Sequence, residues 1–182
     1  MKQMSSSAPE ATPQPEPWLR GTLTDVPAEQ RAVLHALQLA REDVQRWCGG
    51  LTEQEFAARP HGLPSVAFHL RHIVGSLDRL LTYAENKLLS DEQKQWMASE
   101  MDSPTNREEL LKAFERGLAA AEARIIKIDR SQWQEPRGVG RKQFPTTVAG
   151  LIIHCADHTQ RHVGQAVTTS KVLLALREQQ TS

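Results

Sequence analysis

The segment VAGLIIHCADHTQRHVGQAVTTSKVLLAL, residues 148–176, combines the two patterns on which the fold and the site depend. Apolar side chains recur along it, and Pro145 with the two threonines after it forms a helix start. The pattern predicts one helix from Val148 to about Leu176. The same helix carries three histidines at steps of four residues, which are His154, His158 and His162.

Three earlier segments show apolar residues at steps of three and four, the spacing of one helix face. They predict helices over residues 26–48, 65–88 and 106–128, the last after a capping-box pattern at Thr105. Residues 129–144 form a longer polar connection without the alternation of apolar and polar residues that is typical of a strand. We therefore predict no β-strand.

Thr52 and Ser90 each begin a further capping-box pattern and predict short helices between the long ones. Four long helices, each with one apolar face, can bury these faces against one another. The sequence therefore predicts an all-α fold, an up-down-type four-helix bundle with a short extra helix or two in the connections. An irregular all-α domain is the alternative.

The composition argues against several kinds of partner. Lys plus Arg number 22 and Asp plus Glu number 22, so the formal net charge is zero with neutral histidines. Binding nucleic acid through a large basic surface, or an anionic membrane through a polybasic segment, needs an excess of positive charge. Two cysteines cannot form a disulfide framework. We expect neither a nucleic-acid nor a membrane partner.

The first 20 residues are rich in proline and serine and contain no apolar run long enough for a signal-peptide core. The longest apolar clusters elsewhere, such as residues 148–153, are too short to span a bilayer. We expect a disordered N-terminal arm over residues 1–20 and one domain over residues 21–178, in a cytoplasmic protein.

Five of the seven histidines lie on two predicted helices, His69 and His72 on one and His154, His158 and His162 on the other. Side chains four residues apart on a helix have Cβ atoms about 6 Å apart, so two imidazoles can share an ion at metal–nitrogen distances of about 2.0–2.1 Å. Eight residues along a helix rise about 12 Å, which is too far. The pair that binds an ion is therefore 154/158 or 158/162, with a third ligand from His72 or His69. The alternative is that the histidines are hydrogen-bonded residues of the core.

Two motifs resemble the DinB/YfiT-like family. Residues 65–73, SVAFHLRHI, are similar to the start of that family's second helix, where a Ser-Val-apolar run leads to a ligand histidine. Residues 158–165, HTQRHVGQ, are similar to its fourth-helix signature, in which two histidines precede Gly-Gln. The order and separation of the motifs also match, and the likeness covers about residues 27–175.

The resemblance implies a four-helix bundle that holds one divalent metal ion, nickel or zinc, through three histidines. The implied metal ligands are His72, His158 and His162. His69 and His154 would then support these ligands or belong to the core. Gly164 would allow close packing of helices beside the site, and Gln165 would form a hydrogen bond near it.

Characterised members of that family include bacillithiol transferases and a mycothiol-dependent maleylpyruvate isomerase, while many others are known only as DinB-like proteins or metal-dependent hydrolases. The resemblance implies a metal-dependent enzyme of thiol-transferase or hydrolase type, acting on an unknown small molecule. A low-molecular-weight thiol would be the cosubstrate in the first case, and the ion would activate bound water or thiolate as a Lewis acid. The resemblance also implies a homodimer. A non-catalytic metal-binding or stress-related helical binding module is the alternative.

Four other side chains lie near the predicted ligands. Cys155 precedes His158 by three residues and either approaches the ion or fills the core as a small apolar residue. Asp157 points about 100° away from His158 and is expected to be a supporting or surface acid. Arg71 and Arg161 flank the ligands and either attract an anionic substrate or are simply solvated.

Overall fold

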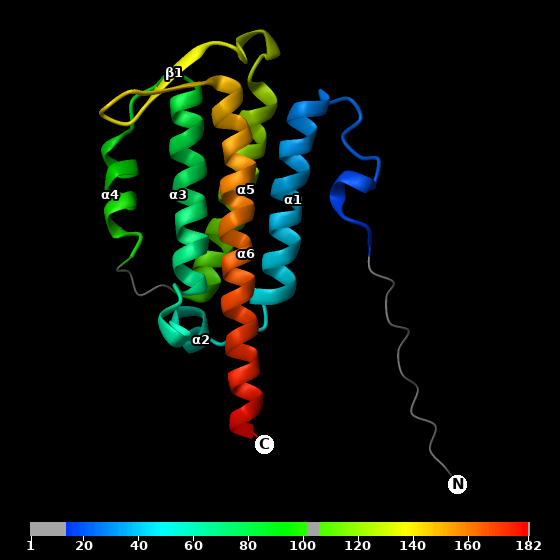
Figure 1. Ribbon diagram of the computed structural model, residues 1–182, viewed down its shortest axis with the longest axis vertical. Coiled ribbons are helices and arrows are strands. Elements are labelled where there is room, and N and C mark those ends of the chain that lie inside the picture. The colour runs from blue at the N-terminus through cyan, green and yellow to red at the C-terminus, as the bar shows by residue number, and fades with distance from the viewer. Residues whose placement is uncertain (1–13, 102–105, 182) are drawn as a thin grey trace.

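The computed structural model describes residues 14–101 and 106–181. Four long helices form its frame (Figure 1), which are α1 (Ala28–Cys48), α3 (Val66–Ala84), α5 (Arg107–Lys127) and α6 (Val148–Thr181). Two short helices, α2 (Glu53–Ala57) and α4 (Asp91–Ser99), lie in the connections. The predicted all-α class, a four-helix bundle with short extra helices, is confirmed.

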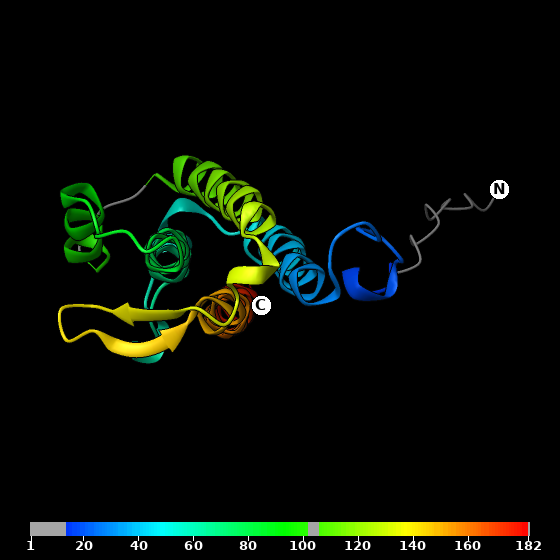
Figure 2. The ribbon, with the colours of Figure 1, turned by 90° about the horizontal axis from the view of Figure 1, so that it is seen from above.

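The long helices do not all alternate in direction along the chain. In Figure 1, α1 and α6 run downward, whereas α3 and α5 both run upward. The chain returns between α3 and α5 through α4, which lies outside the bundle and packs on α3. Helix α6 packs against both α1 and α3, and α3 also packs against α5 (Figure 2). The pair α3 and α6 is therefore antiparallel and in direct contact.

Local signals fix where the helices begin. Ser65 caps α3 and Asn106 caps α5, each by accepting the backbone N–H three residues further on, at 3.1 and 3.0 Å. The capping boxes predicted at Thr52 and Ser90 are both present and begin α2 and α4. The pattern predicted at Thr105 lies outside the described residues.

Helix α3 is shorter than predicted, because it ends at Ala84 and not at residue 88. Asn86 adopts a left-handed backbone with φ 58°, a conformation that asparagine tolerates better than most residues. Leu88, the last residue of the predicted helix, is 89% exposed in the loop that follows α3. The apolar spacing therefore continued past the point where the backbone leaves the helix.

The structure contradicts the prediction that there is no β-strand. Strands β1 (Pro136–Val139) and β2 (Phe144–Thr147) form an antiparallel hairpin within and just after the expected polar connection. Each strand has four residues and includes a proline, so no alternating pattern is long enough to be recognised. The hairpin lies across one end of the bundle, with β1 against α3 and β2 against α6 (Figure 2).

The apolar faces of the long helices meet in one core. Its largest fully buried side chains include one from each long helix, namely Leu37, Leu70, Phe114 and Ile152. Both cysteines are buried and unpaired. No helix within the described ranges is long and apolar enough to cross a membrane.

The arm expected to be disordered, residues 1–20, lies mostly outside the described residues. At its end, Pro17–Leu19 forms a 3-10 turn beside α1. The Arg20 guanidinium donates to both carboxylate oxygens of Glu42 on α1, at 2.6 and 2.8 Å. The described fold therefore includes this turn, ahead of the boundary expected at residue 21.

Candidate metal centre

Three imidazoles converge between α3 and α6. His72 comes from α3, and His158 and His162 come from successive turns of α6. One ring nitrogen of each lies within 4.8 Å of the other two. The Nε2 atoms of His72 and His158 are 3.3 Å apart. Two nitrogens on one tetrahedral zinc ion, each at about 2.0–2.1 Å, are themselves about 3.3–3.4 Å apart, so the spacing fits a single ion.

His154, one turn before His158, does not belong to this trio. Its Nδ1 lies 2.8 Å from the Asp157 carboxylate, and its ring centroid is 5.3 Å from that of His158. Of the two pairs that the helix spacing allowed, the structure brings 158/162 together with the histidine of α3. The choice follows from the register in which α6 packs against α3.

Glu100, which sequence analysis missed, lies directly behind His72. This residue caps the C-terminus of α4, is 7% exposed, and places Oε2 at 2.6 Å from His72 Nδ1. Its Oε1 accepts a hydrogen bond from Arg79 Nη1 at 2.7 Å. Burial alone would raise the pKa of Glu100, but the hydrogen bonds from His72 and Arg79 hold it below its usual value.

This contact decides which nitrogen of His72 faces the other histidines. An ionised carboxylate only accepts hydrogen bonds, so His72 Nδ1 is the donor, which leaves Nε2 as the nitrogen that can coordinate a metal ion. Carboxylates behind metal-binding histidines commonly fix the ring in this way. No spacing signal could have identified Glu100, because only the tertiary fold brings the end of α4 against α3.

His69 occupies a similar position behind His162. It is 1% exposed, and its Nδ1 lies 3.1 Å from the Nδ1 of His162. The contact leaves Nε2 of His162 for the trio. The Nε2 of His69 is buried without a hydrogen-bond partner among the described residues. His69 therefore packs behind the trio and does not join it.

The surroundings lower the pKa of three histidines in this region, His158, His162 and His69. Burial, followed by the charges of neighbouring histidines, lowers the pKa of His158 to about 4. The pKa values of His69 and His162 are lowered to about 4 as well, again first by burial. Neutral imidazole is the form that coordinates metal ions, so the lowered pKa values of His158 and His162 favour the binding of a cation near neutral pH.

The side chains next to the ligands in sequence do not join the trio. Cys155 is fully buried in the core, and burial raises the pKa of its thiol to about 12, in agreement with the apolar interpretation. Asp157 is a surface acid that accepts from His154 and, at 3.0 Å, from Arg161. Neither side chain belongs to the group of potential metal ligands, which consists of the three histidines of the trio.

Two expectations from the resemblance are not met. A Cβ atom at Gly164 would meet nothing within 4 Å, so this glycine does not permit a close approach of helices. Gln165 is exposed, and its side chain forms no hydrogen bond within the described structure. Both residues lie on the outer side of α6, because the buried side at this level is formed by Val163 and Ala166.

A cavity of about 700 Å³ opens beside the trio. It lies between α3, α4, the hairpin and α6, and of the trio only His158 borders it, together with Ser76 of α3. The Ser76 hydroxyl is 3.4 Å from the Nε2 of His72. Arg71 and Arg161 do not line this cavity, so they are not placed to attract a substrate into it. The hairpin that sequence analysis missed forms one of its walls.

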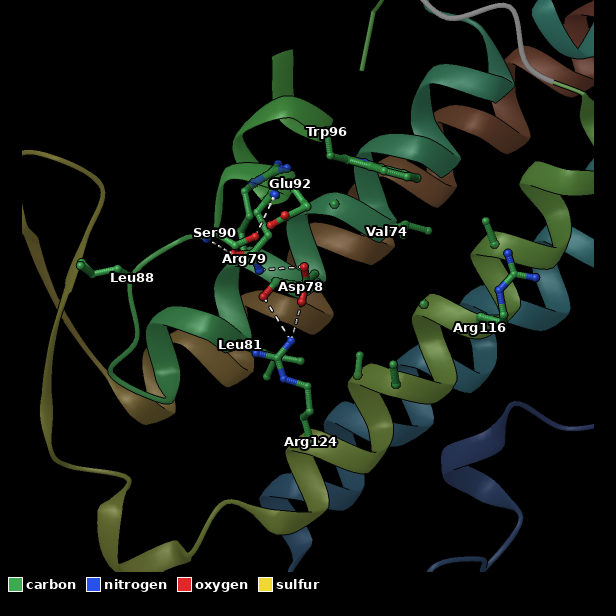
Figure 3. Close-up of a pocket in the computed structure, with 16 residues that line it drawn as sticks. Val74, Asp78, Arg79, Leu81, Leu88, Ser90, Glu92, Trp96, Arg116 and Arg124 are labelled. Atoms are coloured by element: carbon green, nitrogen blue, oxygen red, sulfur yellow. Dashed lines mark hydrogen bonds and ion pairs between the residues drawn. The ribbon is translucent and has the colours of Figure 1, made fainter. Parts of the chain in front are cut away.

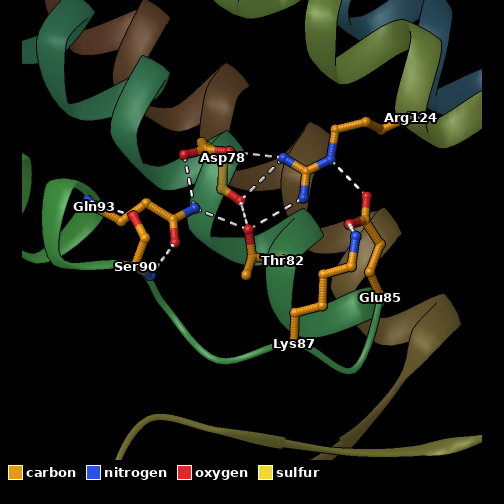
Figure 4. A network of polar contacts seen from close by, with 7 residues as sticks. All are labelled: Asp78, Thr82, Glu85, Lys87, Ser90, Gln93 and Arg124. Atoms are coloured by element: carbon orange, nitrogen blue, oxygen red, sulfur yellow. Dashed lines mark hydrogen bonds and ion pairs between the residues drawn. The ribbon is translucent and has the colours of Figure 1, made fainter.

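A second cavity, of about 580 Å³, lies between α3, α4 and α5 (Figure 3). Its polar end is a network centred on Arg124, which donates to Asp78 at 2.7 Å and to Glu85 at 2.6 Å (Figure 4). Gln93 of α4 donates to the same Asp78 at 2.7 Å. These contacts join the three helices, and none of the histidines lines the cavity. We therefore assign this network a structural role.

The fold and the cluster together define a four-helix bundle with a three-histidine centre between two of its helices. The sequence model of the DinB superfamily matches residues 36–166 of this chain, and the chain therefore belongs to that family. The resemblance that the two motifs indicated is confirmed.

A comparison with solved structures shows the same fold. The chain is similar to the structure described as "Crystal structure of the conserved protein of locus from Enterococcus faecalis", with a TM-score of 0.66 and 16% sequence identity. The alignment covers 80% of this chain and 97% of the other. The search of curated proteins found no match.

Proposed function

We propose that this protein binds one divalent metal ion, nickel or zinc, through His72, His158 and His162. The observation that carries the proposal is the convergence of one nitrogen from each ring within 4.8 Å. Imidazole nitrogen suits both zinc and nickel, and three protein ligands leave room for an exchangeable one. Membership of the DinB superfamily is compatible with this site.

We infer further that the centre serves a metal-dependent enzyme of thiol-transferase or hydrolase type. When bound, such an ion lowers the pKa of coordinated water or of a thiol and so supplies a nucleophile near neutral pH. The cavity of about 700 Å³ lies within the range of small-molecule sites, roughly 300–1,000 Å³. Because His158 lines it, a molecule in the cavity lies beside the trio.

The cysteines limit where a nucleophile can come from. Cys48 and Cys155 are both buried, and burial raises the pKa of each thiol. A thiol attacks as the thiolate, so neither side chain is suited to attack a substrate. With both protein thiols excluded, the nucleophile that we propose is external, either water in a hydrolase or a low-molecular-weight thiol cosubstrate in a transferase.

Elemental analysis of protein purified without chelator tests the metal site. We expect about one equivalent of metal in the unmodified protein and its loss in His158→Ala. The matched control is His154→Ala, on the same helix one turn away and outside the trio, which should retain the metal. Equal metal contents in the unmodified protein and His158→Ala would reject the site.

Turnover separates the enzyme from a non-catalytic metal-binding module. Metal-loaded and chelated protein would be screened with esters and amides, and with electrophiles in the presence of several low-molecular-weight thiols. A metal-dependent rate supports the enzyme. Retained metal without any such rate supports the binding module. The homodimer and the cytoplasmic location remain predictions, and light scattering on the purified protein would test the first.

A further inference from the structure

We propose that the cavity beside His158 takes a small molecule with an apolar body and a carboxylate, and that Arg141 on the hairpin turn binds the carboxylate. This inference rests on the proposed function for what happens to the molecule, but the binding itself does not require the metal. It assigns a substrate class to the site and a role to the hairpin.

The charges that line the cavity all have one sign. Among the described residues that border it, the ionisable side chains other than histidine and tyrosine are Arg79, Lys94 and Arg141, and no aspartate or glutamate is present. The remaining wall is largely apolar and includes Leu80, Leu89, Met97 and Val139. An apolar wall with cationic groups favours a ligand that is apolar and negatively charged.

The three cations differ in whether their charge is already balanced. Arg79 donates to Glu100 at 2.7 Å, and Lys94 donates to Asp91 at 2.8 Å. Arg141 has no ion pair or side-chain hydrogen bond within the described part of the chain, although it borders the cavity. A guanidinium can hold a carboxylate through two parallel hydrogen bonds, so Arg141 is the residue suited to the anion.

The hairpin holds this arginine in place relative to the bundle. At its base, Arg137 donates to the carbonyl oxygen of Ala84, the last residue of α3, at 2.8 Å. At its tip, Gly140 has φ 69° and its carbonyl accepts from the Gln143 side chain at 2.8 Å. The turn that carries the exposed Arg141 is therefore anchored to α3 and braced internally, which limits the backbone entropy lost on binding.

The acids that contact side chains of the cavity wall are themselves paired, as Asp91 is with Lys94, and so do not oppose an anion. Glu100 lies behind Arg79 and His72 and contacts both. Asp157 lies behind His154 and also accepts from Arg161. Each of these carboxylates is thus paired with a positively charged or hydrogen-bonding group, and neither borders the cavity.

Calorimetric titration of the full chain tests the inference. The probes are octanoate and 4-phenylbutyrate, each compared with its neutral alcohol and with the matching amine, in protein freed of metal by chelator and in metal-loaded protein. We expect both carboxylates to bind at least tenfold more tightly than their alcohols and amines. We expect Arg141→Gln to weaken carboxylate binding about tenfold, since a hydrogen bond to a charged group contributes that much or more.

The matched control is Lys142→Gln, which removes the same charge from the next residue of the turn, outside the cavity lining. We expect it to change binding less than twofold. Equal effects of the two substitutions, or carboxylates that bind no better than the alcohols and amines, would overturn the inference. The melting temperature of each variant shows that the fold is retained.

The two proposals can fail separately. Carboxylate binding in chelated protein that depends on Arg141, together with no metal in the purified protein, would leave the inference and reject the metal site. A metal content that depends on His158, together with no preference for carboxylates, would support the metal site and reject the inference about Arg141.

Discussion

At the scale of single residues, the contact between Glu100 Oε2 and His72 Nδ1, at 2.6 Å, orients one of the proposed metal ligands. The three histidines were within reach of sequence analysis, because helix spacing limits which of them can share an ion. Spacing alone left two pairs open, and the resemblance indicated one of them. Glu100 gave no signal, since its contact with His72 depends on how α4 docks against α3.

We predict that Glu100→Gln weakens metal binding. An amide can no longer act as a charged acceptor for His72 Nδ1, and loss of such partners typically costs about 10–100-fold in metal affinity. Competition against a chelator of known affinity measures the change. Glu92→Gln, on the exposed side of the same helix, should leave the affinity unaltered. An affinity in Glu100→Gln equal to that of the unmodified protein would contradict the positioning role.

We predict that neither cysteine reacts with a thiol reagent in the folded protein at pH 8. Cys48 and Cys155 are both buried, and burial raises the pKa of both thiols. Mass spectrometry after brief alkylation should find no label, and two labels once the protein is denatured. Labelling of Cys155 without denaturant would contradict this prediction. It would show that the thiol is accessible and make Cys155 a candidate metal ligand again.

At the scale of elements, the sequence predicted the helices better than the segments between them. Each long helix was identified from the spacing of its apolar face, and the caps at Thr52 and Ser90 were found because capping uses local contacts. The end of α3 was missed, because Asn86 reverses the backbone while apolar residues continue. The hairpin was missed because its strands are short and depend on the helices beneath them.

The contact between α2 and the C-terminal half of α6 leads to a prediction about pH. Arg177 Nε donates to Glu55 Oε1 at 2.7 Å, and this hydrogen bond is the main reason that the pKa of Glu55 falls from 4.5 to about 2. A carboxyl whose pKa is lower in the folded state contributes stability above its unfolded pKa, and this contribution is lost as the pH falls toward the folded value.

We therefore expect Glu55→Gln to lower the free energy of unfolding at pH 7 by about 1 kcal/mol, a value reduced for solvent screening. The difference from the unmodified protein should shrink between pH 4.5 and about 2. Urea unfolding across this range measures it. Glu108→Gln, which removes an exposed partner of Lys112, is the control and should cost less than half as much. A difference that stays constant with pH would contradict the ion-pair explanation.

At the scale of the whole molecule, the proposed ligands join two helices that are distant in sequence. The class of fold was predictable from four apolar faces, but the parallel course of α3 and α5 was not, because it depends on the return of the chain through α4. The cavity was likewise unpredictable, since its walls come from α3, α4, the hairpin and α6.

We predict that metal stabilises the whole fold. An ion bound only by the folded state adds RT ln(1 + [L]/Kd), about 2.7 kcal/mol at a free concentration of 100 Kd. For a chain of this size that corresponds to a rise in melting temperature of roughly 5–10 °C. Differential scanning fluorimetry with and without chelator would measure it. His158→Ala should show no response to chelator, and an unresponsive unmodified protein would count against a filled site.

The hairpin between α5 and α6 places the proposed carboxylate-binding residue apart from the proposed metal ligands. The proposed ligands stand on helices locked into the bundle, whereas the turn over the cavity touches the bundle mainly through its base. If both proposals hold, exchanging the residues of this turn would alter which compounds bind while the three proposed metal ligands stay in place. Ligand selectivity would then change through the turn alone, without any change of the three histidines.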